Sequence, residues 1–127
     1  SSDGSVSGQF LAHLQEFCTG RAQAHTRDEM LRRMPWTEAL PEKNEKTQKE
    51  EVVTRTYFRL VDLLAYLIRN RFTHYSNTGQ IVAELRSIGG IHKFWKLKNK
   101  GVNTWGVPVF DDQDSAQEVR KQDATPF

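Results

Sequence analysis

The stretch over residues 49–71 constrains the fold most strongly, because its apolar residues recur at the spacing of an α-helix. A helix with apolar residues around more than one face is buried on two sides. We therefore predict one long helix here, packed on the domain that follows and on a helix near the N-terminus, or on a second copy of the chain. Its apolar positions are Val53, Tyr57, Leu60, Leu64 and Leu67, with Phe58, Val61, Ala65 and Ile68 widening the stripe.

A shorter helix is predicted over residues 78–88. Apolar residues recur at offsets of 0, 1, 4 and 7 from Ile81, which is the pattern of an inward helix face. Positions 76–78 carry residue types that cap helix N-termini, and Gly89 and Gly90 provide the backbone freedom that ends a helix. The polar residues of this helix are therefore expected to point outward.

Two strands are predicted after this helix, over residues 91–98 and 102–110. Trp105, Val107 and Val109 alternate with other residues, which gives the second strand one apolar face. Residues 99–101 join the strands, and Gly101 suits the positive-φ position of a short hairpin loop. The sequence therefore predicts a mainly α fold with a small antiparallel β-hairpin, an α+β arrangement.

The N-terminal part carries shorter signals. We expect a first helix over residues 7–19, a short helix over 27–34, a loop that contains Trp36 and Leu40, and a linker over 42–49. The predicted organisation is a flexible N-terminus (1–8), a helical extension and linker (9–48), a domain (49–110) and an acidic disordered tail (111–127).

Charge is distributed unevenly along the chain, although the formal net charge is only +2. Residues 52–110 carry nine Lys and Arg residues against two acids, a net charge of +7, whereas the flanking segments are acidic. No Asp or Glu occurs between Glu84 and Asp111. A basic central segment attracts phosphate polymers or anionic lipid, and the alternative is a lysine-rich surface that is only solvated.

The order of helix, turn, short helix closed by Gly-Gly and basic hairpin over residues 50–110 resembles the winged-helix form of the helix-turn-helix. The string TGQIVAELRSIGGIHKFWKLKNKGVNTWGVP is similar to the C-terminal winged-helix domains of phage and plasmid helicase–primases. In those proteins a polar helix that ends in Gly precedes a basic hairpin with a Gly and a Trp four residues apart, here Gly101 and Trp105. The standard core has two helices before the recognition helix. Either the 49–71 stretch breaks in two, or the 27–34 helix supplies the missing element.

This resemblance implies a winged helix with an N-terminal helical extension that binds a replication origin as part of a larger replication protein. Because the chain does not begin with Met, we interpret it as a piece of a longer protein. The lone Cys18 excludes an internal disulfide framework, and it favours an intracellular location.

A double-stranded DNA surface is predicted on the 78–88 helix and the hairpin. A helix fits the major groove, where Gln and Arg make bidentate contacts with base edges, and lysines contact the backbone. RNA is the less expected partner. The predicted contact residues are Ser76, Asn77, Thr78, Gln80, Ala83, Arg86 and Ser87 on the helix, and Lys93, Lys96, Lys98, Asn99 and Lys100 on the hairpin.

Other functions have weaker support in the sequence. Trp95 and Trp105 lie in alternating strands, so we expect them in the core rather than stacked on bases. No acid partner or oxyanion turn accompanies His74 and Ser76, and no Gly loop opens a helix, so we predict no enzyme, metal site or cofactor. The rival hypothesis is a protein-interaction or dimerisation module that uses the 49–71 helix, and no membrane span is expected.

Overall fold

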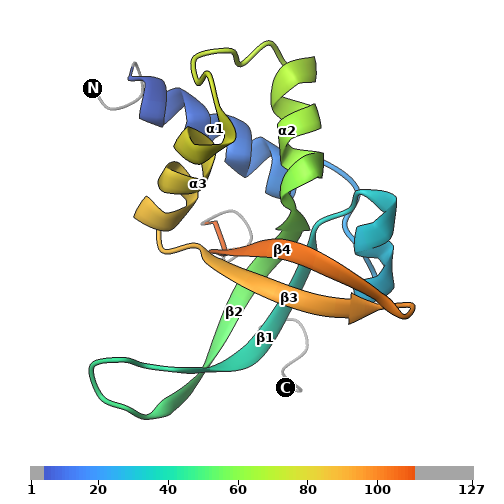
Figure 1. The fold of residues 1–127 in the computed structure, drawn as a ribbon, viewed down its shortest axis with the longest axis vertical. Coiled ribbons are helices and arrows are strands. Elements are labelled where there is room, and N and C mark those ends of the chain that lie inside the picture. The colour runs from blue at the N-terminus through green and yellow to red at the C-terminus, as the bar shows by residue number, and fades with distance from the viewer. Residues whose placement is uncertain (1–4, 111–127) are drawn as a thin grey trace, which may run out of the picture.

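The computed structural model describes residues 5–110. Their elements are an N-terminal helix, a short 3₁₀ helix, a β-hairpin, two helices and a second β-hairpin (Figure 1). No helix in this described part is both long and apolar enough to cross a bilayer. The bounds are α1 Val6–Thr19, η2 Arg27–Arg32, β1 Trp36–Lys43, β2 Glu50–Arg59, α2 Leu60–Arg69, α3 Thr78–Ser87, β3 Ile91–Leu97 and β4 Lys100–Pro108.

The four strands form one antiparallel sheet in the order β1-β2-β4-β3. Strand β2 links the two hairpins, because it pairs with β1 through residues 50–57 and with β4 through residues 55–59. The rest of β2 and its partner segment of β1 extend beyond β4 as a two-stranded projection, which we call the β1–β2 arm (residues 39–54; Figure 1).

Each face of the sheet is covered by helical segments. The helices α1, α2 and α3 gather on one side, which we call the helix face, around Phe58, Trp105 and Val107 (Figure 1). On the opposite side, which we call the η2 face, Met30 lies in a second cluster with residues that include Tyr57 and Trp95. Because successive strand residues point to opposite faces, the register assigns every side chain of the hairpins to one of them.

The predicted mainly α fold with a small hairpin is wrong, since the structure is 38% helical and 32% strand, with all four strands in one curled sheet. The prediction of a winged helix with an N-terminal helical extension is corrected with it. The error lies in residues 49–71, where β2 and α2 replace the single predicted helix. The first half of that stretch is rich in β-branched and aromatic residues, which favour a strand. Tyr57 and Phe58 are neighbours and both are buried, so covering on both faces hides the period of two.

Other segments follow the sequence more closely. The predicted helices over 7–19, 27–34 and 78–88 are confirmed as α1, η2 and α3, and the two predicted strands are confirmed as β3 and β4. The first turn of α1 includes Gly8, whose backbone N–H donates to the Ser5 hydroxyl at 2.9 Å, so this part of the predicted flexible N-terminus is helical. The predicted acidic tail over residues 111–127 lies outside the described residues.

Strand β1 is the second correction. The segment predicted as a loop around Trp36 and Leu40 and the start of the predicted linker pair with β2 along eight registered positions. The predicted domain boundary at residue 48 therefore falls in the turn of the β1–β2 hairpin. The sequence pattern of a strand is weak here, because β1 is an edge strand that contains Pro41 and few large apolar residues.

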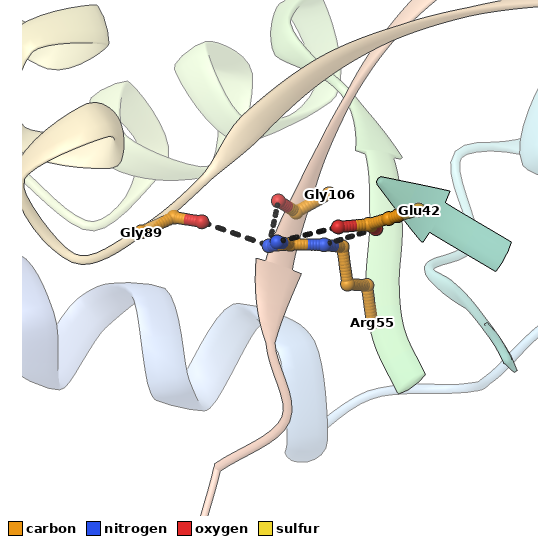
Figure 2. Close-up of polar contacts among 4 residues, drawn as sticks. All are labelled: Glu42, Arg55, Gly89 and Gly106. Carbon is orange, nitrogen blue, oxygen red and sulfur yellow. Dashed lines mark hydrogen bonds and ion pairs between the residues drawn. The ribbon is translucent and has the colours of Figure 1, made fainter. Parts of the chain in front are cut away.

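Arg55 ties three parts of this fold together (Figure 2). Its guanidinium pairs with Glu42 of β1, with Nε 2.6 Å from Oε2 and Nη2 3.1 Å from Oε1. The remaining nitrogen, Nη1, donates to the carbonyl oxygens of Gly89 at 2.8 Å and Gly106 at 3.2 Å. Since Gly89 follows α3 and Gly106 lies in β4, this one side chain holds the end of α3 against the sheet.

Tyr57 supplies a stability prediction, because its buried hydroxyl has no hydrogen-bond partner among the described residues. Burial raises the pKa of Tyr57 to about 12. Because the folded protein holds the Tyr57 proton more tightly than the unfolded chain does, the contribution of this proton to the free energy of unfolding is complete below about pH 10. That contribution is lost as the pH rises towards 12. We expect Tyr57→Phe to be as stable as the wild type or up to about 1 kcal/mol more stable at neutral pH, and to lose less stability above pH 10.

Urea unfolding of both proteins at neutral and alkaline pH measures this difference, and the titration of other groups cancels in the comparison. A Tyr57→Phe variant that is clearly less stable at neutral pH would show that the hydroxyl has a partner in solution.

Candidate nucleic-acid interface

Helix α3 begins with a capping box. The side-chain oxygen of Asn77 accepts a hydrogen bond from the backbone N–H of Gln80 at 3.0 Å. In return, Oε1 of Gln80 accepts from the backbone N–H groups of Ser76 at 2.6 Å and Asn77 at 3.3 Å. Of the predicted contact residues at this end, Asn77 and Gln80 therefore have a structural role in starting the helix, while Thr78 is exposed with them.

The start of α3 and the hairpin lie apart. The C-terminal end of α3 leads directly into β3, and the helix extends away from the strands (Figure 1). Ten helical residues span about 15 Å, so residues 76–78 are separated from β3 by roughly the length of the helix. Only the second half of α3 adjoins the hairpin.

That second half exposes Ala83, Arg86 and Ser87. The acid on this helix, Glu84, accepts a 2.5 Å hydrogen bond from the hydroxyl of Tyr75. Residues two apart on a helix do not face each other, so the Glu84 carboxylate lies on a different side of α3 from the Arg86 guanidinium. The hydrogen bond to Tyr75 therefore keeps the negative charge away from the exposed cation.

Trp105 connects α3 to the hairpin. The guanidinium of Arg86 lies 5.0 Å from the centre of the Trp105 ring, and the His92 ring meets the same indole edge-on at 5.8 Å. His92 in turn contacts Asn103 across the hairpin, with Nε2 3.1 Å from Oδ1. Trp105 itself is only 5% exposed, so it acts as a buried spacer that fixes the distance between helix and strands.

We call the resulting patch the α3–hairpin surface. It lies on the helix face, at the end of the hairpin that adjoins α3, and Lys96 continues it towards the β3–β4 turn, since Lys96 alternates with Trp95 and shares the orientation of His92. Its members are Ala83, Arg86 and Ser87 of α3 with His92, Lys96 and Asn103 of the hairpin.

The four predicted lysines do not share one face of the sheet. Lys93 alternates onto the η2 face, where its Nζ lies 5.3 Å from the centre of the Trp95 ring. Lys100 pairs with Leu97 and belongs to that same face, at the end of the hairpin. Lys96 projects from the helix face, and Lys98 lies in the turn. The structure thus places Lys96 on the same face as α3 and Lys98 in the turn at the far end of the hairpin from α3, and it separates Lys93 and Lys100 from them on the η2 face.

The hairpin turn differs from the predicted one. Lys98 and Asn99 form a two-residue turn with φ angles of 48° and 64°, so they hold the positive-φ positions that we predicted for Gly101. Gly101 lies in β4 instead, where the ring of Phe94 covers it. The turn places Lys98 and Asn99 at the exposed tip of the hairpin.

Ion pairing decides which cations are available to a ligand. Arg55 and Arg59 of the basic segment are paired with Glu42 and Asp62, and both are largely buried. By contrast, none of the cations near the hairpin takes part in an ion pair with a residue of the described part of the chain. The unpaired cations are Arg86, Lys93, Lys96, Lys98 and Lys100.

Several predictions about individual residues can now be compared with the structure. Trp95 and Trp105 are confirmed as core residues, with 6% and 5% of their surfaces exposed. Cys18 is buried, and burial raises the pKa of its thiol. Phe94 was not among the predicted site residues, although it is 61% exposed. The sequence does indicate this exposure, because Phe94 alternates with Trp95 and so shares its side of the strand with His92 and Lys96.

We compared the chain with known proteins. No protein-family model, curated protein or solved structure matches it significantly. The resemblance to the C-terminal domains of helicase–primases therefore stays a prediction, and the functional assignment rests on the geometry of the surface itself.

Proposed function

We propose that this chain is a DNA-binding domain that contacts the nucleic acid through the α3–hairpin surface and the turn at Lys98. Double-stranded DNA is the proposed partner, within a larger replication or regulatory protein that acts inside the cell. The predicted contact residues Ala83, Arg86 and Ser87 remain part of the proposed interface. Asn77 and Gln80 cap the helix instead of contacting DNA.

The observation that carries the proposal is the group of exposed, unpaired cations on one side of the molecule. Arg86 and Lys96 lie on the helix face and Lys98 at the tip, and the one acid of α3 is held by Tyr75 on another side of the helix. Elsewhere the structure pairs arginines with acids, as at Glu38, Glu42 and Asp62. A row of uncompensated cations on a rigid support is what a phosphate backbone requires.

The exposed face of α3 suits close approach to a groove. Ala83 and Ser87 are small, so they let the helix backbone come near base edges, and Arg86 reaches beyond them as a potential partner of guanine. The N-terminal residues Asn77 and Gln80 contribute by holding the first turn, so their oxygens are not the base-reading atoms of this proposal. Lys96 and Lys98 then contact backbone phosphates beside the groove.

The direct test is a binding titration by fluorescence anisotropy with a random-sequence duplex at several salt concentrations. With three cations, Arg86, Lys96 and Lys98, in contact with the DNA, log affinity should fall with log salt at a slope of about −2 to −3. Absence of binding at low salt, or binding that does not depend on salt, would contradict the proposal.

A second candidate function is self-association through α2, because this helix exposes an apolar stripe. Val61 is 61% exposed and Ile68 is 74% exposed, and the exposed Ala65 lies between them on the same side of the helix. Such a stripe is typical of a contact surface when it is continuous. A two-fold dimer would present two α3–hairpin surfaces to two half-sites.

Sedimentation of the wild type and a Val61→Asp/Ile68→Asp variant tests this second candidate. If α2 is the interface, the wild type sediments as a dimer and the variant as a folded monomer, since both positions are exposed in the single chain. A monomeric wild type at high concentration would remove the dimer and leave the DNA-binding proposal in place.

A further inference from the structure

Phe94 is a large aromatic residue on the exposed part of the hairpin. It is 61% exposed, although the other two aromatic residues of the hairpin, Trp95 and Trp105, are almost fully buried. Its side chain lies on the helix face between His92 and Lys96, opposite Asn103. Folding of residues 5–110 therefore leaves most of this ring accessible to a ligand.

Gly101 allows the ring to lie against the hairpin. A methyl group at Gly101 would come within 2.5 Å of Cζ and 2.9 Å of Cε1 of Phe94, so the ring covers the backbone of this glycine. A positive φ does not explain the glycine, because the positive-φ positions of this hairpin are Lys98 and Asn99. The missing side chain thus lets the ring settle on β4 in place of projecting freely.

The surroundings of the ring combine an aromatic surface with cations and a polar group. Lys96 is two residues away on the same side of β3, about 7 Å along the strand. Lys98 follows at the tip, and the side-chain oxygen of Asn103 is held by His92 at 3.1 Å, which orients its amide. An aromatic ring bordered by lysines is the arrangement that binds unpaired nucleotides, because bases stack on the ring and phosphates meet the cations.

We infer that Phe94 is a stacking residue for an unpaired nucleobase, so that the domain prefers DNA with a single-stranded extension over a blunt duplex. This inference rests on the proposed function and extends it. The duplex contacts α3, and the strand that continues beyond it follows the hairpin, where its first unpaired base stacks on the Phe94 ring and its next phosphates meet Lys96 and Lys98. Gly101 is a positioning residue, which acts by leaving room for the ring beside its backbone.

The experiment compares the affinities of the full chain for a blunt duplex and for the same duplex with a single-stranded extension. In the wild type we expect a preference of about tenfold for the extended probe, as is typical of one stacked base. Phe94→Ala should reduce this ratio to about one, Phe94→Trp should retain it, and Gly101→Ala should lower it by displacing the ring. A 2-aminopurine at the first unpaired position should be quenched by the wild type and not by Phe94→Ala.

Val52→Ala is the matched control, because Val52 is another exposed apolar strand residue, 73% exposed, on the β1–β2 arm. It should leave the ratio and the quenching as in the wild type. A ratio of one in the wild type, or a ratio retained in Phe94→Ala, would overturn the stacking role while duplex binding still supports the proposed function.

Failure to bind either probe would instead contradict the proposed function and this inference together. A change in sedimentation of Phe94→Ala in the absence of DNA would also overturn the inference, because it would place Phe94 in a contact between chains.

Discussion

Reversing the charges of Lys96 and Lys98, together with that of Lys100, which borders the same turn although its side chain points to the η2 face, is expected to abolish DNA binding without unfolding the domain. All three side chains are exposed, and none is in an ion pair with a described residue, so their loss removes no internal interaction. Each charged contact with a phosphate contributes about 1 kcal/mol or more, and reversal adds repulsion. We therefore expect an affinity loss of about 100-fold or more, measured by anisotropy, with an unchanged circular dichroism spectrum.

The matched control reverses three lysines on the β1–β2 arm. Lys43, Lys46 and Lys49 are also exposed, and their reversal changes the net charge by the same amount. If binding depended only on net charge, both triple variants would lose the same affinity. The proposed surface requires that the arm variant keeps most of it, so equal losses would show that the hairpin lysines have no special position.

Replacing Arg55 is expected to give a large loss of stability. Arg55→Met keeps the aliphatic part of the side chain but leaves Glu42 and the carbonyls of Gly89 and Gly106 without their donor. Removing one partner of a largely buried ion pair is strongly destabilising, and here partial exposure of Glu42 reduces the effect to about 2–4 kcal/mol. Urea unfolding at neutral pH measures the change.

The comparison for Arg55 is Arg27→Met, because Arg27 makes a similar two-point contact with Glu38 but is 47% exposed. An exposed pair contributes below about 1 kcal/mol, so this variant should be much closer to the wild type. Similar losses in both variants would mean that burial does not distinguish the two pairs. Because Arg55 holds the end of α3, we also expect Arg55→Met to weaken DNA binding more than its unfolding alone explains.

Local patterns predicted most of the elements that have one covered side. Helices α1 and α3 and strand β3 expose one face and bury the other, so their periodicity or alternation is visible in the sequence. Strand β4 is buried on both faces over residues 104–107, and it was predicted from the alternation of Trp105, Val107 and Val109.

The prediction failed for strand β2, because both faces of its second half are covered. Its apolar positions also fit a helical spacing that continues into α2. Strand β2 ends at Arg59 and helix α2 begins at Leu60, and no capping residue or glycine marks this boundary in the sequence.

The candidate site shows the same division between local and long-range information. The exposed positions of α3 follow from its period, and the lysines are visible in the sequence. Their distribution over two faces depends on the register with β4, and the packing of Arg86 on Trp105 depends on the placement of α3. The net charge of +7 over residues 52–110 also includes Arg55, whose pairing with Glu42 depends on the β1–β2 hairpin that was not predicted.

The most direct measurement is a titration of the isotope-labelled chain with a DNA duplex, followed by amide chemical shifts. The account predicts that the largest shifts fall on the second half of α3, on residues 92–96 of β3 and on the turn at Lys98 and Asn99. Shifts concentrated on α2 or on the β1–β2 arm, or no shifts at saturating DNA, would contradict it.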